Sequence, residues 1–439
     1  MLAEKLVEQD HQVFPIAPWR NPSLVDAASN SDGMFFQVAD LTDGQEIASI
    51  TKEVGADMFI SNMDMVLKAN VAGIVKRELP DVDVPCPDGE VFNAVEGNKT
   101  KLRELIGKVD KKYNPIYFPV SDYQDIEEAV DYFESEGIEM VVKPGGLTAG
   151  KGVRVMGPHF QTYKEGRKYA QTLVWDLDQA GSVIEEKLEG PEFTFEAYTD
   201  GESFVPNLAY DHPFRDDGDK GPGTGGMGSF TMPKNKLLPF LNQRDYNEAS
   251  QLMSRVLAQL KSEGHDFKGN LFGSFIKTKK GLKIIEFNAR GGDPEYINGL
   301  GRIDDNVDIY DFLHKMARGG LKPDDIKFKK AATLVRHYVT PEYAREDREP
   351  FRHRFKLNKR LAEAFGCRVL FAAAVRDDGI DEYITTGPSR TFGFYVEGRS
   401  PMRCREKADQ ADEAALQGLL EHRDDIGKRS YIRNLKRFK

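Results

Sequence analysis

The pattern of apolar and polar residues predicts a chain in which short strands alternate with helices. Short apolar runs typical of strands occupy residues 13–17, 58–60, 182–188, 271–276 and 282–287. Helical periodicity marks residues 65–78, 98–108, 126–133, 163–177 and 246–263. The first segment therefore suits an open α/β layer, and a chain of 439 residues is long enough for two to four domains.

The second half of the chain adds a hairpin, a long loop and a further set of strands. Lys279, Lys280 and Gly281 separate two apolar runs, which predicts a β-hairpin. Strand-like runs return at residues 331–339, 368–375 and 390–396, before a last helix predicted over residues 406–420. Residues 210–228 are polar, rich in glycine and too long for a simple turn, so we expect them to be functional.

Composition narrows the class of protein. The chain is 40% hydrophobic and 30% charged, which suits a globular protein, and no apolar run is long enough to span a bilayer. The net charge of −10 disfavours nucleic acid as a partner. Cys86, Cys367 and Cys404 have neither metal-type spacing nor a disulfide pattern. The N-terminus has no apolar signal core, so we expect a cytoplasmic protein without membrane partners.

The first chemical signal is a glycine-rich loop between two strand-like runs, at residues 140–156. A lysine ends the first run, and a second lysine lies in the loop; the glycines and lysines concerned are Lys143, Gly145, Gly146, Gly150, Lys151 and Gly152. Glycine lets backbone N–H groups approach an anion closely. The loop is not a P-loop, because Gly152 stands where Ser or Thr would ligate magnesium. It predicts a flap over phosphates, with an ordinary hairpin turn as the alternative.

The second signal is K-I-I-E-F-N-A-R-G-G-D-P-E, at residues 283–295. Strand alternation places Ile284, Glu286 and Asn288 on one side, with the two oxygen ligands about 7 Å apart. Magnesium prefers such ligands, and Arg290 on the same face could pair with a carboxylate or phosphoryl group. Asp293 lies just beyond. The alternative is a solvated strand carboxylate.

Two further segments suggest anion and nucleotide binding. Within residues 216–228, five of the eight residues from Gly221 to Gly228 are glycine. Asp211 and His212 precede this segment, and His212 alone is typical of a loop hydrogen-bonding residue. Residues 183–192 form an extended segment whose backbone could read an adenine edge, with Glu192 on the ribose hydroxyls. A plain edge strand is the alternative for this second segment.

The order of these motifs resembles the ATP-grasp superfamily. The motifs are N-K-T-K, V-V-K-P-G-G-L-T-A-G-K-G-V, V-I-E-E-K-L-E-G-P-E, G-P-G-T-G-G-M-G and I-I-E-F-N-A-R-G-G-D-P-E. Within the superfamily the chain is similar to the phosphoribosylamine–glycine ligase family, from about residue 97 to its end. The final A-D-Q-A-D-E-A-A-L and H-R-D-D-I-G, the latter at residues 422–427, also resemble that family.

The resemblance implies an α/β (α+β) fold with an ATP-grasp core. A truncated open-sheet N-terminal domain over residues 1–94, its first strand missing, would precede the core at residues 95–326. A flap subdomain would cover about residues 113–182, and a small C-terminal domain residues 327–439. The family acts as a monomer or weak dimer in this interpretation.

The implied reaction joins glycine to 5-phosphoribosylamine with ATP and Mg²⁺ (or Mn²⁺), through glycyl phosphate, in purine biosynthesis. Phosphorylation turns the poor acyl donor into a reactive one, so catalysis is mainly positioning and charge neutralisation. The resemblance assigns the ATP phosphates to Lys99, Lys143 and the loop residues Gly145, Gly146, Gly150, Lys151 and Gly152. It assigns adenine to Glu185, Glu186 and Leu188, and the ribose to Glu192. It assigns Glu286 and Asn288 to the metal, and Arg290, Asp293, Asp211 and Thr224 to catalysis.

Several positions depart from the family pattern. The family's G-G-R-E-H-A loop is not found near the N-terminus, and its G-P-E motif corresponds to residues 61–64, Ser-Asn-Met-Asp. Gly223 replaces the asparagine of G-P-N-T-G-G-M-G. These departures fall on the amine-acceptor side. They leave two alternatives, a related carboxylate–amine ligase that uses another amine and a nucleotide-binding paralogue without turnover.

Overall fold

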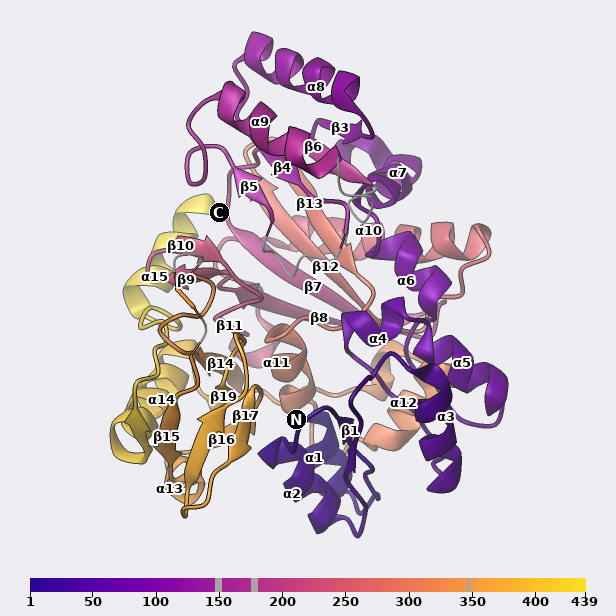
Figure 1. Cartoon of the computed structure of the whole chain (residues 1–439), viewed down its shortest axis with the longest axis vertical. Coiled ribbons are helices and arrows are strands. Elements are labelled where there is room, and N and C mark those ends of the chain that lie inside the picture. The colour runs from indigo at the N-terminus through magenta and orange to yellow at the C-terminus, as the bar shows by residue number, and fades with distance from the viewer. Residues whose placement is uncertain (147–151, 175–180, 346–347, 350) are drawn as a thin grey trace.

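A long antiparallel sheet runs through the middle of the molecule in the computed structural model, which describes residues 1–146, 152–174, 181–345, 348–349 and 351–439 (Figure 1). Its described strands follow the order β13-β12-β7-β8-β11-β14-β19-β16. Their bounds are β7 Glu192–Thr199, β8 Phe204–Asp211, β11 Gly228–Phe230, β12 Gly269–Thr278, β13 Gly281–Asn288, β14 Ala332–Tyr338, β16 Cys367–Phe371 and β19 Phe392–Gly398. The sheet crosses the expected domain boundary at residue 327, because β11 pairs with β14.

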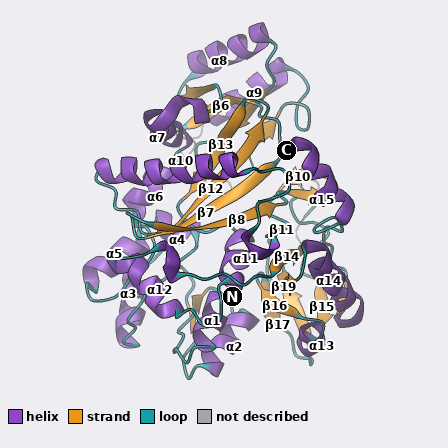
Figure 2. Ribbon diagram, turned by 180° about the vertical axis from the view of Figure 1, so that it is seen from behind, coloured by secondary structure: helices purple, strands orange, loops and turns teal. Residues whose placement is uncertain are grey.

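Helix α10, Gln243–Ser262, lies across one face of this sheet (Figure 2). Asn242 caps it in a reciprocal capping box with Asp245, which satisfies the first free N–H groups. One side of α10 is buried in the main hydrophobic core, through Ala249, Leu252, Met253, Val256, Leu257 and Leu260. Helices α11, Glu295–Arg302, and α12, Ile309–Arg318, complete this part. No described helix has the length and apolar character needed to cross a membrane.

The flap is a smaller sheet with its own hydrophobic core. Its described strands follow the order β3-β6-β4-β5, and the helices α8 and α9 cover it at the top of Figure 1. The bounds are β3 Tyr117–Val120, α8 Tyr123–Glu136, β4 Met140–Lys143, β5 Arg154–Val155, α9 Tyr163–Val174 and β6 Ser182–Glu186. Val142, Ile184 and Phe133 belong to a core cluster separate from that of the large sheet. Helix α7, Lys99–Asp110, joins the flap to the rest.

The N-terminal part begins with a helix and then a short parallel β-α-β unit. The bounds are α1 Leu2–Val7, β1 Ile16–Ala17, α2 Pro22–Asn30, β2 Phe36–Gln37, α3 Gly44–Glu53, α4 Asp64–Lys68, α5 Val71–Glu78 and α6 Gly89–Val95. The absence of the family's first strand stays a prediction, because β1 lies within the apolar run already expected over residues 13–17. Strand β1 pairs in parallel with β2. It is only two residues long because Pro15 and Pro18 flank it and lack N–H groups for pairing.

The C-terminal part adds a second small sheet, in the order β17-β18-β15-β20. The bounds are β15 Arg354–Leu357, α13 Lys359–Ala364, β17 Ala374–Arg376, β18 Glu382–Thr385, α14 Pro401–Ala415, β20 Leu416–Gly418 and α15 Arg429–Leu435. The hairpin β9, Phe214–Asp216, and β10, Lys220–Gly223, packs near α15 (Figure 1).

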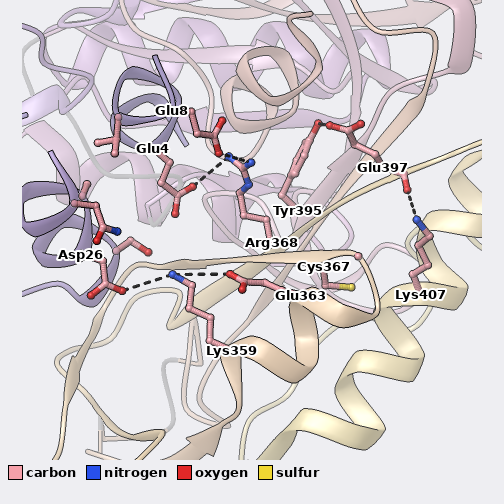
Figure 3. Close-up of a pocket in the computed structure, with 15 residues that line it drawn as sticks. Glu4, Glu8, Asp26, Lys359, Glu363, Cys367, Arg368, Tyr395, Glu397 and Lys407 are labelled. Carbon is pink, nitrogen blue, oxygen red and sulfur yellow. Dashed lines mark hydrogen bonds and ion pairs between the residues drawn. The ribbon is translucent and has the colours of Figure 1, made fainter. Parts of the chain in front are cut away.

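The N-terminal helices α1 and α2 and the C-terminal part meet around a pocket of about 560 Å³ (Figure 3). Arg368 pairs with Glu8, with Nη2 and Oε1 2.7 Å apart, and Lys359 pairs with Asp26 at 3.5 Å. The charged walls of the pocket therefore join the N-terminal helices to the C-terminal part.

Three further expectations change in the structure. The single helix expected over residues 65–78 is two helices, because Asn70 adopts a left-handed φ of 61° between α4 and α5. The last long helix ends at Ala415, and the residues after it form β20 against β15. Residues 58–60 form only an isolated bridge, between Met58 and Asp83.

The helix α7, the β12–β13 hairpin and the strand β6 occur where the sequence predicts them. The expected face of Ile284, however, is wrong. A β-bulge lies between its pairing with Phe275 and the pairing of Glu286 with Ser274. The extra residue turns Ile284 into the same core as Phe287, away from Glu286.

Candidate active site

Two lysines and two glutamates meet where the flap sheet adjoins the large sheet. Lys143, the last residue of β4, places Nζ 2.7 Å from Oε2 of Glu185 on β6. Lys99, the first residue of α7, places Nζ 3.5 Å from Oε2 of Glu286 on β13. The charge of Lys143 also helps to lower the pKa of Glu286, so these side chains face one common region.

The pKa values of Lys143 and Glu185 depend on their burial and on neighbouring charges. Burial lowers the pKa of Lys143, with Glu185 opposing the shift. Burial would raise the pKa of Glu185, but Arg103 and Lys143 outweigh it and lower that pKa to about 2. Glu185 is thus ionised and pairs with Lys143 beside the glycine-rich loop.

Arg103 is a site residue that the sequence analysis missed. Its side chain is 2% exposed and donates from Nε to Oε1 of Glu185 at 2.6 Å. It also donates to the carbonyls of Ile284 and Ile285 at 3.0 and 2.8 Å, next to the bulge in β13. Arg103 therefore joins the flap sheet to the large sheet. Its spacing of four residues from Lys99 on a predicted helix was the signal that could have found it.

Glu286 and Asn288 lie side by side on β13, as the sequence predicts. The Asn288 amide donates from Nδ2 to Oε1 of Glu286 at 3.1 Å. Burial would raise the pKa of Glu286, but Lys99, the Asn288 amide and Lys143 lower it overall. Among the described residues no group of three or more His, Cys, Asp or Glu side chains forms a metal site. Two oxygen-donor side chains of this kind fit a divalent cation that takes its other ligands from phosphate and water.

Arg290 lies against a buried carboxylate of the N-terminal part. Its Nη2 is 3.3 Å from Oε1 of Glu96, whose other oxygen accepts from the Ala289 N–H at 2.8 Å. Glu96 is 3% exposed and was also missed by the sequence analysis. Asp64, in the segment that replaces G-P-E, adds to the charge field that raises the pKa of Arg290, although burial opposes it.

Residues 61–64, the segment that replaces G-P-E, contact the loop after β13 directly. The Asn62 side chain donates to the Gly291 carbonyl at 3.1 Å and accepts from the Gly291 N–H at 2.7 Å. This reciprocal pair fixes residues 61–64 beside Arg290. The altered motif therefore lies next to the predicted catalytic residues, although its sequence differs from the family pattern.

Asp293 is clamped by two residues of the C-terminal part, Arg390 and His337. Its Oδ2 is 2.9 Å from Nη2 of Arg390, and its Oδ1 is 3.0 Å from Nε2 of His337. Burial would raise the pKa of Asp293, but Arg390 and His337 outweigh it and lower that pKa well below its usual range. The sequence offered no local signal for either partner, since each is a lone residue in a strand region more than 40 residues away.

The turn that contains Thr224 lies next to Asp293 and Pro294. Arg390 donates from Nη1 to the Gly225 carbonyl and to the carbonyl of Asp293, the latter at 2.7 Å. Gly226 has a φ of 104°, and a Cβ there would lie 2.6 Å from Pro294 Cδ. Thr224 uses its hydroxyl within the turn, donating to the Pro213 carbonyl at 2.8 Å and accepting from the Gly226 N–H at 3.0 Å.

A cluster of carboxyl groups lies near this turn: Glu295 is buried, and Asp211 and Glu192 are half-buried. Burial, with the charges of Glu295 and Glu192, raises the pKa of Asp211 well above its usual range. Burial also raises the pKa of Glu295 and of Glu192 to about 7 each. Asp211 accepts from the N–H of His212 at 2.7 Å. His212 itself is fully buried, and burial lowers its pKa to about 4, so it is neutral at pH 7.

Some backbone groups of residues 183–192, the segment expected to bind adenine, already form hydrogen bonds within the protein. The N–H groups of Glu186 and Lys187 donate to the carbonyls of Ile116 and Glu139, at 2.8 and 2.7 Å. Gly145 donates its N–H to the Ser182 hydroxyl at 3.0 Å, and the Gly152 carbonyl accepts from Tyr169 at 2.6 Å. Gly146 ends the described part of the loop, whereas Gly150 and Lys151 lie outside the described residues.

Comparison with known proteins supports the chemistry of this arrangement. The family model described as phosphoribosylglycinamide synthetase, ATP-grasp (A) domain, matches residues 98–296. The phosphoribosylamine–glycine ligase of Pyrococcus furiosus is 32% identical, over 98% of this chain and 92% of its own length. That of Methanocaldococcus jannaschii is 35% identical, over 77% of this chain and 75% of its own length. The chain belongs to the phosphoribosylamine–glycine ligase family.

Solved structures agree on the fold of this ATP-grasp ligase. The phosphoribosylamine–glycine ligase of Thermotoga maritima matches with a TM-score of 0.75 at 20% identity, over 97% of this chain and 96% of that one. The biotin carboxylase domain of Hydrogenobacter thermophilus 2-oxoglutarate carboxylase matches with a TM-score of 0.67 at 16% identity, over 99% and 90% of the two chains. That second structure contains MgADP, ADP and bicarbonate.

Proposed function

We propose that the chain ligates glycine to 5-phosphoribosylamine with ATP, through glycyl phosphate, and releases ADP, phosphate and glycinamide ribonucleotide. The observation that carries the proposal is the convergence of Lys99, Lys143 and Glu286 where the flap adjoins the large sheet. Cationic side chains beside an ionised, oxygen-donor pair match the needs of a triphosphate and a divalent cation. Membership of the ligase family supports the choice of substrates.

The nucleotide lies, in this proposal, between the two sheets. Lys99, Lys143 and the loop that begins at Gly145 and Gly146 contact its phosphates. The adenine lies along Glu186 and Leu188. We assign the Leu188 N–H as its hydrogen-bond donor, because the N–H groups of Glu186 and Lys187 already bond within the flap. Glu185 acts indirectly, by holding Lys143 in place.

Magnesium is the metal we assign to Glu286 and Asn288. Both offer oxygen ligands, and the lowered pKa of Glu286 keeps its carboxylate ionised at neutral pH. Bound there, the metal would neutralise charge on the nucleotide phosphates. Manganese shares the preference for oxygen ligands and is the alternative.

Glycine lies next to the phosphates in this proposal. Arg290 pairs with the glycine carboxylate, and the backbone of the turn at Thr224 donates toward the phosphoryl group. The half-buried carboxyl group of Asp211 and its acidic neighbours favour a cation, and we assign them the glycine ammonium group. Asp293 acts by fixing the turn through Arg390.

An assay of ADP release tests the proposed function. We expect ADP release to require a divalent cation, glycine and phosphoribosylamine, because the acyl phosphate must form and then react with the amine. Omission of either substrate should reduce the rate to background, as followed by a coupled ADP assay. Turnover with other amines but none with phosphoribosylamine would favour the related ligase with a different acceptor. ATP binding without any turnover would favour the second alternative, a nucleotide-binding paralogue that is not an active ligase.

The pKa of Glu192 predicts a pH dependence of ATP binding. A pKa raised to about 7 leaves this carboxyl group protonated below that pH and ionised above it. The ionised form accepts hydrogen bonds from the ribose hydroxyls, so the KM for ATP should fall about threefold to tenfold from pH 6 to pH 8. Steady-state kinetics across this range measure it. Glu192→Gln should flatten the profile, and an unchanged profile in that variant would contradict the assignment.

A further inference from the structure

The motif H-R-D-D-I-G, residues 422–427, lies outside the proposed substrate groups but contacts the loop that carries them. Its arginine, Arg423, is fully buried, which is unusual for a charged side chain. Nε and Nη2 of Arg423 donate to the two carboxylate oxygens of Asp425, at 2.8 and 2.7 Å. This bidentate pair orients the guanidinium group, so its remaining donors point in a defined direction.

Those remaining donors reach the β9–β10 hairpin. Nη2 of Arg423 donates to Oδ1 of Asp219 at 2.9 Å, and Nη1 donates to the Phe214 carbonyl at 3.1 Å. The hydroxyl of Tyr431 donates to the other oxygen of Asp219 at 2.5 Å. Asp219 has a φ of 58°, a left-handed conformation that aspartate tolerates in turns.

The backbone of the hairpin is bound to the same motif in both directions. The N–H of Gly218 donates to Oδ2 of Asp425 at 2.8 Å. In return, the N–H of Asp424 donates to Oδ1 of Asp217 at 2.8 Å. The turn between β9 and β10 is therefore fixed by side chain and main chain of a segment about 200 residues away in sequence.

The hairpin leads directly into the proposed substrate turn. Strand β10 ends at Gly223, immediately before Thr224, whose N–H donates to the Pro213 carbonyl at 2.8 Å, just ahead of β9. The charge of Asp219 also reaches Glu192, the residue we assign to the ribose. A displacement of Asp219 would thus move the Thr224 turn through the hairpin backbone, whereas it would reach Glu192 only through its charge.

We propose that Arg423 is a positioning residue, which sets the place of the Thr224–Gly226 turn over glycine by holding Asp219 and the β9–β10 hairpin. It touches none of the groups assigned to substrate and acts through the hairpin alone. The inference rests on the proposed function only for the identity of the substrate that this turn meets.

Arg423→Lys and Asp219→Asn test the proposal in the full-length protein. Lysine keeps the charge but loses the planar fork, and asparagine keeps the shape but loses the charge of the partner. We expect each variant to raise the KM for glycine about tenfold, with the Kd of a non-hydrolysable ATP analogue changed less than about threefold. The double variant should show little further rise in the glycine KM, because both changes weaken the same Arg423–Asp219 contact that holds the hairpin.

A second readout does not depend on catalysis. Lys220 is exposed at the start of β10, so trypsin can report the opening of the hairpin. We expect cleavage after Lys220, followed by mass spectrometry, to accelerate about tenfold or more in both variants. If the parent protein shows no turnover with glycine and phosphoribosylamine, the proposed substrates fail, but this assay still decides the role of Arg423.

Arg336→Lys is the matched control. Arg336 is also fully buried and pairs with Asp409 on α14 at 2.8 Å, and among the described residues no side-chain interaction joins it to the β9–β10 hairpin. Its variant should lose stability without a change in the glycine KM or in cleavage after Lys220. An equal change in all three variants, or no change in glycine KM and cleavage in Arg423→Lys, would overturn the proposal.

Discussion

Turnover of the Glu286→Gln variant should fall by about 10³-fold or more, which corresponds to a barrier raised by about 4 kcal/mol. Glutamine keeps the size and one oxygen of the side chain but removes the charge that the lowered pKa maintains at neutral pH. The metal would then bind more weakly, and the charge on the phosphates would be less well neutralised. The coupled ADP assay at saturating substrates measures the loss, and calorimetry of MgADP binding reports the metal site separately.

Glu382→Gln is the control for the loss of a carboxylate. Glu382 is on β18 in the small C-terminal sheet and pairs with Lys356 at 2.6 Å, away from the two sheets that form the site. Its rate should remain within about twofold of the parent rate, since exposed ion pairs contribute little. Near-normal turnover and MgADP binding in Glu286→Gln would remove the metal assignment.

The second large effect is expected from Lys143→Gln. The value of kcat/KM for ATP should fall about 10²-fold to 10³-fold, because a cation buried beside the phosphate loop contributes more than one in water. The fold should persist, since Glu185 keeps its contact with Arg103 at 2.6 Å. Steady-state kinetics with ATP as the varied substrate measure the change, and the midpoint of thermal unfolding checks the fold.

Lys187→Gln separates this effect from a general loss of positive charge on the flap. Lys187 follows β6 and pairs with Glu139 at 2.6 Å on the surface of the flap. Its variant should keep kcat/KM for ATP within about twofold of the parent value. Equal losses in the two lysine variants would mean that Lys143 has no particular contact with the nucleotide.

Local patterns were enough to predict where several residues of the candidate nucleotide site lie relative to one another. The spacing of Glu286 and Asn288 on a strand predicted that they share a face, and their hydrogen bond agrees with this. The helix predicted from periodicity over residues 98–108 is α7, which starts at Lys99 with Asn98 as its cap. Such signals depend on residues within a few positions of one another, so a single sequence carries them.

Irregular geometry was where the local patterns failed. The β-bulge beside Ile285 depends on the partner strand, which alternation along one strand cannot reveal. Asn70 interrupts a stretch that has helical periodicity throughout, because its side chain accepts from the Gly89 N–H at 2.8 Å. In both places a distant contact decides the backbone conformation.

The sequence by itself determined the class of chemistry: a phosphate loop, an oxygen-donor strand and the ordered motifs of an ATP-grasp ligase. Only the tertiary structure showed that Arg103, Glu96, His337 and Arg390 hold the predicted residues, and that Arg423 holds the glycine-rich hairpin. The physical reason is that buried charges require partners, and the fold supplies them from strands and helices far apart in the chain. Periodicity and spacing record which face a residue occupies, but not which distant charge it meets.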